Sequence, residues 1–521
     1  MPVPGHRNRQ QHVVRRGRDR RARTLMGPAG LARVRGQAPR AAVIGGGIAG
    51  LAAATALAER GVKVTLYERR PQLGGRLAGW PVELSDGSGA TMSRGFHAFF
   101  RQYYNLRGLL RRADPGLRML TALPDYPLQH SAGLRDSFAR VPRTPPWSAL
   151  GFVAQSPTFG LRDLARMNAR AALPLLDIRV PDVYEQLDGI SARDLLDRIR
   201  FPQAAHHLAF EVFSRSFFAD PRELSAAELA LMFHIYFLGS SEGLLFDVPN
   251  EPFPAALWEP LAGYLAGHGA ELRTGESVES IRPGRHGGSH VMTGDTESLY
   301  DAVVLALDTP GLQHLVARSP QLADEEWREK VRQLRVAPAF LVSRLWLDRP
   351  VSADRPGFLG TSGYGCLDNV SVLERWEGEA ARWSARSGGS VVELHAYATD
   401  PQAQRPAQQD SLLAELHRVY PETREAKVLD SCHEWNADCP LFPVGGYADR
   451  PGVRTPDPTV TLAGDLVRTD LPVALMERAA TTGFLAANAL LAQWGLRGQT
   501  LWTVPDKGRT GLLRTLNRLF G

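Results

Sequence analysis

A short segment with the sequence RGFHAFFRQYYN (residues 94–105) combines a histidine, two arginines and several aromatic rings. A histidine with a pKa near neutrality can take up a proton, and we expect His97 to do so. Aromatic faces attract cations, so rings beside such a base suit a reaction in which positive charge develops. The rings are those of Phe96, Phe99, Phe100, Tyr103 and Tyr104. We predict that the segment lines an apolar cavity, although His97 could instead bond a backbone carbonyl or a cofactor while the rings form core.

Residues 40–70 carry the pattern that would position such a site. An apolar run over 41–44 predicts a buried strand, an alanine-rich run over 51–60 predicts a helix, and Gly61 ends that helix. A second strand is predicted over 62–67. Strand, glycine turn, helix and strand in this order are typical of a Rossmann nucleotide-binding unit.

Three glycines and one acid of this unit have separate roles in binding a dinucleotide. Gly45 allows the tight turn, Gly47 lets the backbone approach a pyrophosphate, and Gly50 lets the helix pack on the sheet. Backbone N–H groups and the helix dipole then hold the phosphates. Glu68 follows Gly50 by eighteen residues, where a carboxylate can bind ribose hydroxyls. The spacing predicts a dinucleotide cofactor.

A second glycine turn follows directly, within ERRPQLGGRL. Gly74, Gly75 and the guanidinium of Arg76 come beside the expected diphosphate, and we include Arg69 among the cofactor contacts. An NAD enzyme usually has no need of this second contact with the cofactor. The arrangement resembles the signature of the flavin amine oxidase and carotene desaturase superfamily, which implies FAD as the cofactor.

The same resemblance extends to the C-terminal part of the chain. Residues 459–491 resemble the strand, loop and helix with which this superfamily returns to its flavin. The resemblance implies that Gly464 and Asp465 contact the ribityl or pyrophosphate region. It also implies that a helix N-terminus near Met476 faces the N1–C2 edge of the flavin, where a helix dipole favours the reduced anion. The segment ELRTGESVESI resembles the strand whose backbone near Val278 touches adenine.

These segments predict a mixed α/β fold with a Rossmann-type FAD-binding domain that is discontinuous in sequence. The gaps between its segments would hold a substrate domain of helices plus a mixed sheet, since they read as mostly helical and then as alternating strands. The expected bounds are 1–37 for a basic arm; 38–130, 246–312 and 430–495 for the FAD-binding domain; 131–245 and 313–429 for the substrate domain; and 496–521 for a tail.

The aromatic segment itself carries a more specific resemblance. It is similar to the pattern G-L-H-x-F-F-x-x-Y-x-N of plant-type phytoene and zeta-carotene desaturases. Within that group the long shared pattern is most similar to the bacterial isorenieratene synthases, which are beta-carotene desaturase/methyltransferases. The matching residues are Gly95, His97, Phe99, Phe100, Tyr103 and Asn105. The longer segments are SRGFHAFFRQYYNLRGLLRRADP, DYPLQHSAG, EVFSRSFFADP, SSEGLLFDVPNEPF and NADCPLF.

This resemblance implies an FAD-dependent oxidoreductase that removes hydrogens from the two rings of beta-carotene and shifts one geminal methyl group, giving aromatic ends. A methyl shift implies a carbocation, so the rings would stabilise it and His97 would take the final ring proton. Asp438 in NADCPLF is a second candidate catalytic residue, or alternatively part of a polar turn. Molecular oxygen and a membrane quinone both remain open as the electron acceptor.

Two alternatives remain at this point. The first is another flavoenzyme on the same scaffold, such as a linear carotene desaturase, a carotene isomerase or a porphyrinogen oxidase. The second is a non-redox lipid carrier, because Rab GDP-dissociation inhibitors share the architecture. The complete set of glycines and acids in this chain argues against the second alternative.

Positive charge is concentrated at the N-terminus. Residues 1–40 contain eleven arginines and a single aspartate, whereas the whole chain has a net charge of +6, so the remainder is acidic. With so little apolar content the arm is expected to be disordered. It could bind anionic lipid or nucleic acid, or it could lie upstream of a true start at Met26. For the protein as a whole we expect no nucleic-acid partner and no metal.

A carotenoid dissolves in membranes, so access to lipid matters. No run of 18 apolar residues is present, and no transmembrane helix is predicted. We expect a cytoplasmic protein attached peripherally to the inner face of the cell membrane. The C-terminal TGLLRTLNRLFG suits an interfacial amphipathic helix or a helix packed on the protein. Residues 225–246 are nearly apolar throughout, which suits a tunnel wall, a lipid-dipping helix or core.

Overall fold

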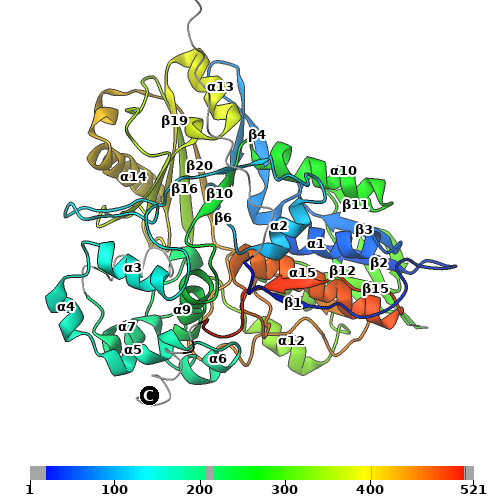
Figure 1. Ribbon diagram of the computed structural model, residues 1–521. Helices are drawn as coiled ribbons and strands as arrows, with labels where there is room; N and C mark the ends of the chain where they lie inside the picture. The colour runs from blue at the N-terminus through cyan, green and yellow to red at the C-terminus, as the bar shows by residue number, and fades with distance from the viewer. Residues whose placement is uncertain are drawn as a thin grey trace, which may run out of the picture.

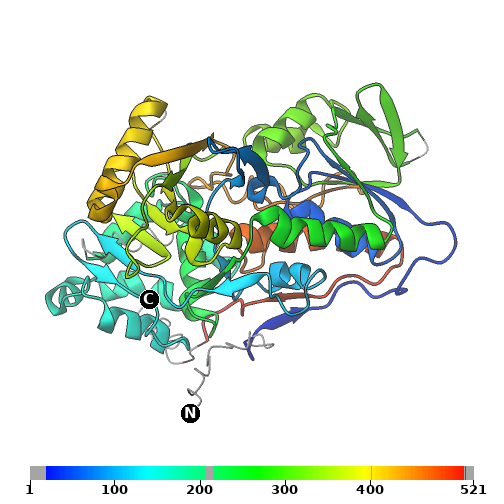
Figure 2. The same ribbon diagram turned by 90° about the horizontal axis from the view of Figure 1, so that it is seen from above.

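A computed structural model describes residues 19–202, 205, 215–285, 287–400, 402–509 and 511. Their elements fall into three groups (Figure 1): a nucleotide-binding part on the right, a seven-stranded sheet at the upper left, and a set of helices at the lower left. The view from above again shows the nucleotide-binding part beside the other two groups (Figure 2). Each group combines segments that are far apart in sequence.

The nucleotide-binding part is centred on a five-stranded parallel sheet with the strand order β11-β3-β2-β15-β21. The first crossover runs from β2 through α1 to β3, and it confirms the strand–helix–strand unit predicted for residues 40–70. The elements are β2 (Arg40–Ile44), α1 (Ile48–Ala58), β3 (Lys63–Glu68), β11 (Glu271–Thr274), β15 (Ala302–Leu305) and β21 (Val460–Leu462).

Both faces of this sheet are covered. Ala41 and Val43 of β2 pack in the core that includes α1, whereas Ala42 and Ile44 pack in a second core on the opposite face. A strand buried on both faces must be apolar throughout, which explains the continuous apolar run in the sequence. The second core is built with β12 (Ser280–Pro283), β13 (Ser289–Thr293), β14 (Thr296–Tyr300), α11 (Thr309–Ala317) and α12 (Glu325–Arg332).

Helix α15 (Leu475–Gln493) lies closely against α1 and brings the C-terminal part of the chain back to the nucleotide site. The approach depends on a small residue. A Cβ atom on Gly483 would stand 2.2 Å from the carbonyl oxygen of Ala49 and 3.0 Å from the Cβ of Ala52. Gly483 therefore determines how near the two helices can come.

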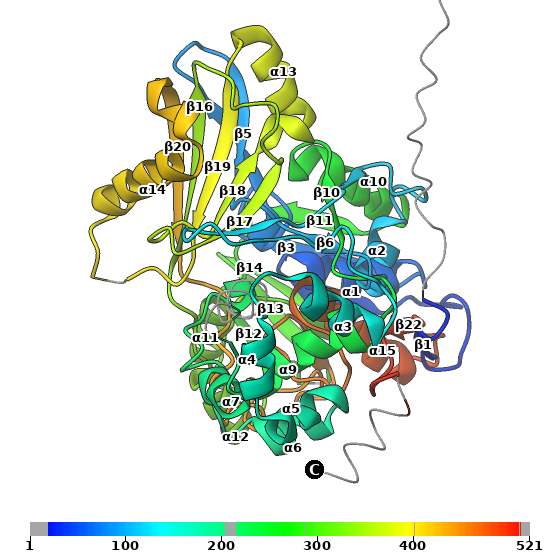
Figure 3. The same cartoon turned by 60° about the vertical axis from the view of Figure 1, so that its left-hand side comes forward.

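The seven-stranded sheet has the order β20-β16-β19-β18-β17-β8-β9 and is mixed, because β8 and β17 are parallel while the other neighbouring pairs are antiparallel. Helix α14 packs Leu412 and Leu416 onto one face of it, and Figure 3 shows this helix beside the strands. The elements are β8 (Leu128–His130), β9 (Arg135–Asp136), β16 (Phe340–Leu347), β17 (Phe358–Ser362), β18 (Asn369–Val372), β19 (Ser390–Ala396), α14 (Arg405–Val419) and β20 (Val428–Asn436).

A small three-stranded sheet, β6-β10-β7, holds the aromatic segment in place between the two larger sheets. Phe100 of β6 is paired with Phe246 of β10. This sheet and its neighbours comprise β4 (Gly79–Glu83), β5 (Gly89–Ser93), β6 (Phe99–Phe100), α2 (Tyr104–Leu110), β7 (Leu120–Ala122), β10 (Phe246–Pro249), α10 (Glu259–Gly267) and α13 (Gly378–Ser387).

The segment between β9 and β10 is mostly helical, as its sequence predicts. Within it, residues 226–238 are almost entirely buried, and the hydroxyl groups of Tyr236 and Tyr103 lie 2.8 Å apart. This stretch is therefore protein core rather than a helix that dips into lipid. The helices are α3 (Trp147–Gln155), α4 (Leu161–Arg166), α5 (Ala169–Leu176), α6 (Asp182–Leu187), α7 (Ala192–Ile199) and α9 (Ala226–Phe233).

Two expected domain boundaries do not match the seven-stranded sheet, since the one at 130 falls at the end of β8 and the one at 430 falls inside β20. Strand β8 was expected to end the first FAD-binding segment, but it pairs with β17. Strand β20 was expected mostly in the last FAD-binding segment, but it pairs with β16. Their hydrogen bonding assigns both strands to the substrate side, since edge pairing depends on distant partners that local patterns do not reveal.

The expectation of a disordered arm over 1–37 is wrong for its described part. Strand β1 (Arg23–Leu25) pairs antiparallel with β22 (Leu501–Thr503), and Asp19 forms an ion pair with Arg509. Arg23 forms an ion pair with Asp506, so the tail neutralises part of the arm's positive charge. Residues 1–18 and the proposed interfacial helix beyond residue 511 lie outside the described residues. Among the described helices, none is long and apolar enough to cross a membrane.

We predict that Gly483→Ala destabilises the protein by at least about 1–3 kcal/mol, because the added methyl group must push α15 away from α1. The matched control is Gly263→Ala in α10, where a Cβ would meet open space. That change should be neutral or stabilising by up to about 1 kcal/mol. Chemical denaturation of both variants checks this, and equal stabilities would contradict the proposed role of Gly483.

Candidate FAD-binding and active site

The carboxyl ends of four parallel strands open into one cavity of about 610 Å³. Gly45, Glu68, Ala306 and Gly464 line it from the ends of β2, β3, β15 and β21. Ligands of open parallel sheets bind in this position. The opposite side of the cavity is lined by residues of the seven-stranded sheet, so a ligand on the nucleotide-binding part faces the substrate part directly.

The first glycine turn has the geometry predicted for it. Gly45 has a φ of +109°, and a Cβ there would stand 2.2 Å from the carbonyl oxygen of Ala306. A Cβ on Gly50 would stand 1.9 Å from the carbonyl oxygen of Gly45, so Gly50 serves packing and does not itself line the cavity. Helix α1 begins after Gly47 without a side-chain cap, which leaves backbone N–H groups directed at the cavity.

Glu68 is held at the edge of this turn by backbone donors. The N–H of Gly46 donates to its Oε2 at 2.8 Å, and the N–H of Arg70 donates to its Oε1 at 2.9 Å. Val278 and Arg69 line the cavity together with Glu68. The carboxylate therefore has a defined orientation at the end where the adenosine of a dinucleotide was expected.

The second glycine turn touches the first. The N–H of Gly74 donates to the carbonyl of Gly46 at 2.8 Å, and a Cβ on Gly75 would stand 3.1 Å from the Cα of Gly47. Gly74 has a φ of +111°, and any Cβ there would collide with the indole of Trp258. Two turns without side chains thus form one continuous backbone surface that a diphosphate can approach.

Arg76 follows the second turn and pairs with Asp465 through an Nη2–Oδ1 distance of 2.5 Å. Burial lowers the pKa of Arg76, but Asp465, Cys439 and Asp438 together raise that pKa by more, so the net shift is upward. The guanidinium therefore remains charged. Both residues line the cavity, as the sequence predicts for a contact with the cofactor.

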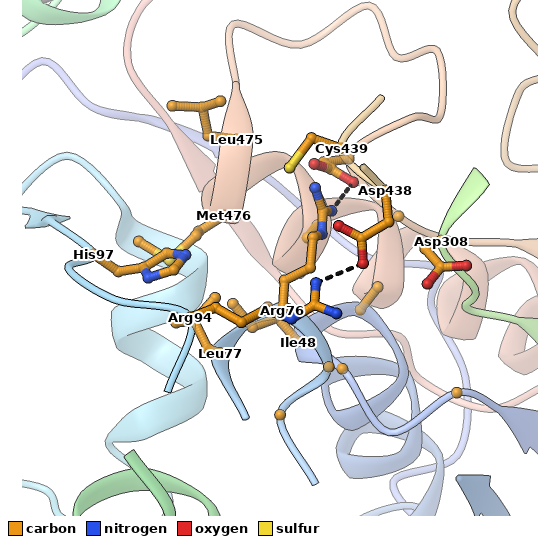
Figure 4. A pocket seen from close by; sticks show the side chains of 18 of the residues that line it. Ile48, Arg76, Leu77, Arg94, His97, Asp308, Asp438, Cys439, Leu475 and Met476 are labelled. Carbon is orange, nitrogen blue, oxygen red and sulfur yellow. Dashed lines mark hydrogen bonds and ion pairs between the residues drawn. The ribbon is translucent and has the colours of Figure 1, made fainter. Parts of the chain in front are cut away.

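A second buried ion pair, between Arg94 and Asp438, lies close by, and Figure 4 shows these two side chains pointing toward one another. Arg94 Nη1 and Asp438 Oδ2 are 2.5 Å apart, and Arg94 also donates to the side chain of Asn436 at 3.1 Å. Arg94 Nε and Asp438 Oδ1 are buried without a hydrogen-bond partner. Arg94 was not among the predicted site residues, although it opens the segment that was singled out.

The N-terminus of α15 also faces the cavity. Leu475 has a φ of +52°, and Leu475, Met476 and Ala479 line the cavity wall. Glu477 points away, accepting hydrogen bonds from the N–H groups of Asn105 and Leu106 at 2.8 and 2.9 Å. The prediction that Met476 lies at the site is consistent with this geometry, while Glu477 acts as a cap for α2.

These features fit FAD. Buried polar atoms without partners, two uncapped helix N-termini and paired arginines suit an anionic group, while the apolar remainder suits a flavin ring. Residues from both glycine turns would hold the diphosphate, Glu68 would bind the ribose, and α15 would lie beside the flavin. When bound, FAD would act as the acceptor for hydride.

His97 points into the same pocket as Arg76 and Met476 (Figure 4). Its Nδ1 donates to the carbonyl of Gly95 at 2.9 Å, so Nε2 carries the lone pair. Burial, with smaller effects of His395 and Arg76, lowers the pKa of His97 to about 4, against the opposing hydrogen bond to the carbonyl of Gly95 and the Glu393 carboxylate. The expectation of a pKa near neutrality is therefore wrong, because desolvation disfavours the charged imidazole.

The aromatic wall differs in part from the prediction. Phe96, Phe100 and Tyr103 line the cavity, but Phe99 and Tyr104 do not. Phe99 and Phe100 are consecutive in β6, so their side chains point to opposite faces, and Phe99 is core. Tyr104 begins α2 and is buried against other parts of the protein. These two residues are removed from the predicted set.

Further wall residues come from segments that were quoted only for their resemblance to isorenieratene synthases. DYPLQHSAG, EVFSRSFFADP and SSEGLLFDVPNEPF each place a ring on the cavity, and the shared pattern was the signal that could have found them. Two more rings come from strands β16 and β17. The wall is completed by Tyr126, Leu128, Phe218, Phe246, Phe340 and Phe358.

A cluster of polar residues interrupts this apolar wall. His395 near the end of β19 and Tyr397 just after that strand line the cavity together with Asp368 and Asn369. His395 lies directly under the aromatic segment, since a Cβ on Gly95 would stand 2.4 Å from its ring. None of these residues was predicted, because the residues that surround them come from strands distant in sequence.

Comparison with known proteins identifies the scaffold. The family of flavin-containing amine oxidoreductases matches residues 48–491. The chain belongs to this family. Membership shows an FAD-dependent oxidoreductase and confirms the predicted cofactor, enzyme class and mixed α/β fold. The alternative of a non-redox lipid carrier is therefore wrong.

Three similar proteins illustrate the range of this family. A carotenoid phi-ring synthase of Streptomyces griseus is 73% identical over 505 residues, covering 97% of this chain and 98% of that protein. A carotenoid phi-ring synthase of Chlorobaculum tepidum is 28% identical over 589 residues, covering 90% and 91%. The solved structure of a putrescine oxidase bound to putrescine, 17% identical and covering 88% and 99%, shares the fold with a TM-score of 0.64.

We predict that Arg76→Met raises the Kd for FAD at least about tenfold, which corresponds to about 1.4 kcal/mol. The change removes a cation beside the diphosphate and leaves the Asp465 carboxylate facing it. Titration of the apoprotein with FAD, followed by flavin fluorescence, measures the effect. Arg349→Met is the control, because its partner Glu425 and Arg349 itself are exposed. Unchanged affinity in Arg76→Met would contradict the assigned site.

Proposed function

We propose that this flavoenzyme acts on the ring ends of a carotenoid, with beta-carotene as the expected substrate, and makes them aromatic by dehydrogenation with a methyl shift. The observation that carries the proposal is that the flavin-binding cavity continues into a wall of aromatic side chains. The two phi-ring synthases resemble this chain over nearly its whole length, which supports the same substrate class.

The wall has the arrangement that a cationic hydrocarbon needs. Phe96 stacks on Phe358 with ring centroids 4.2 Å apart, and Phe246 meets Phe96 and Phe358 edge-on at 5.5 and 5.8 Å. Aromatic faces stabilise a desolvated cation by about 2 kcal/mol or more. An apolar wall also keeps water from adding to that cation. Both effects favour rearrangement over hydration.

The flavin side of the cavity keeps its own groups in fixed states. Burial raises the pKa of the Cys439 thiol to about 11, with a smaller opposing effect of Arg76, so this residue is a neutral thiol near the flavin. Asp438 is tied to Arg94, so it orients that guanidinium rather than acting alone. We propose that oxygen or a membrane quinone reoxidises the cofactor.

Attachment to the inner face of the cell membrane, from the cytoplasm, forms part of the proposal. Trp147 and Leu150 on α3 are 63% and 55% exposed, and one turn separates them on the helix. Residues 139–176 contain five arginines and one aspartate. Exposed tryptophan and basic residues together suit an anionic lipid surface. Figure 1 shows α3, α4 and α5 together at one end of the molecule.

We predict that expression in a bacterium that makes beta-carotene yields aromatic-ended pigments four or eight hydrogens lighter, with all carbons retained. Chromatography with absorption and mass detection identifies them. Unchanged beta-carotene beside FAD-loaded protein would contradict the proposed substrate. The same test in strains that accumulate phytoene, zeta-carotene or lycopene then examines the alternative of a linear carotene desaturase.

We also predict that the pair of changes Trp147→Glu and Leu150→Glu releases the protein from vesicles of phosphatidylglycerol. Sedimentation should show at least about a tenfold loss of binding, because each change replaces inserted apolar surface with charge. Val428→Glu with Leu429→Glu on β20 is the matched control, since these residues are also exposed. Equal binding of the two double variants would argue against the α3 surface.

A further inference from the structure

A row of polar side chains runs along β19 into the substrate end of the cavity. Glu393, His395 and Tyr397 occupy alternate positions, and alternation along a strand places them on one face. The intervening residues pack in the apolar core with α14 on the other face; they are Val392, Leu394 and Ala396. His395 and Tyr397 reach the cavity, whereas Glu393 lies behind them and is fully buried.

Hydrogen bonds join this row into a single chain. Arg344, opposite Glu393 on β16, donates through Nη2 and Nε to Glu393 Oε2 at 2.7 and 3.0 Å. The other carboxylate oxygen, Oε1, lies 2.9 Å from His395 Nε2. The hydroxyl of Tyr397 lies 3.0 Å from His395 Nδ1. Asn369, opposite His395 on β18, donates to the Tyr397 oxygen at 2.9 Å.

The charge of Glu393 determines the direction of the chain. Burial raises the pKa of Glu393, but Arg344 and His395 lower it by more, to about 2, so it is a carboxylate that only accepts. His395 Nε2 must then carry a hydrogen and donate it. The N–H of Phe96 is farther from that nitrogen, at 3.2 Å. His395 Nδ1 is left as an acceptor, and the O–H of Tyr397 donates to it.

We propose that Tyr397 is the catalytic residue that takes the ring proton, with His395 as its base and Glu393 as a positioning residue. The inference rests on the proposed function, which supplies a ring cation after hydride departure. A ring C–H bond breaks, its electron pair stays in the ring, and the proton forms an O–H bond on Tyr397. The former hydroxyl proton of Tyr397 moves to His395 Nδ1. A neutral ring and an imidazolium beside the Glu393 carboxylate result.

His97 is less suited to this role. Its Nδ1 is bonded to a carbonyl rather than a carboxylate, and the charge that it would gain stands near Arg76. In contrast, His395 has an acid partner of opposite charge 2.9 Å away. A buried imidazolium is stabilised by such a partner, as in other proton relays built from a carboxylate, an imidazole and a hydroxyl.

Tyr397→Phe tests the inference in FAD-loaded protein, with beta-carotene in phospholipid vesicles. We expect kcat for aromatic product to fall about a hundredfold while the KM changes little. The isotope effect with ring-deuterated beta-carotene should rise, because proton removal becomes rate-limiting. A substitution that only disturbed the local structure would not raise this isotope effect. Tyr420→Phe is the control, since the Tyr420 hydroxyl is buried without a hydrogen-bond partner.

The outcomes separate two failures. If the wild type holds FAD but makes no aromatic product, the proposed function is wrong and the inference is wrong with it. If the wild type makes the product and Tyr397→Phe keeps its kcat and isotope effect, only the inference is wrong. Should Tyr397→Phe not fold, NMR of ¹⁵N-histidine-labelled wild type decides, with the resonance assigned by His395→Gln. The Nε2–H tautomer supports the relay, and an Nδ1–H tautomer would overturn it.

Discussion

Charge buried in a low-dielectric cavity has to be paired, and two ion pairs of this kind determine the architecture. Arg76 with Asp465 and Arg94 with Asp438 join segments 389 and 344 residues apart in the chain. Removing either partner would leave an uncompensated charge, which costs about 3–5 kcal/mol. The N-terminal segments that hold Arg76 and Arg94 therefore depend on the residues that follow β21 and β20. A discontinuous cofactor domain follows from this electrostatic requirement as much as from the sheet order.

Local constraints explain why part of the site could be predicted. Gly45 and Gly74 have positive φ values that favour glycine. A requirement of this kind depends on only a few neighbouring residues. Glu68 follows at a spacing that the strand length dictates. Arg94, His395 and Tyr397 have no comparable local pattern. Their roles depend on register between strands that are distant in sequence, which residue types alone do not reveal.

The corrections have the same physical origin. A basic arm looks disordered by composition, but Asp19 and Arg23 find opposite charges in Arg509 and Asp506 of the tail. The residue type of His97 suggests a pKa near neutrality, but burial lowers that pKa. In each case the surroundings outweigh the intrinsic preference of the residue. Sequence patterns predict an element well when its own residues determine its structure. They predict it poorly when contacts with residues distant in sequence determine it.

The polar row on β19 is difficult to explain by stability alone. Glu393 and His395 are 0% and 1% exposed, and Arg344 beside them is 4% exposed. Replacing a buried ionic group by well-packed apolar residues is often neutral or stabilising, so a wall that only had to hold a hydrocarbon would be better built without these charges. An apolar cavity offers a ring cation no acceptor for its proton. The desolvation cost of the row is therefore consistent with the proposed chemistry, in which hydride would leave toward the flavin side of the cavity and the proton would leave toward the opposite sheet.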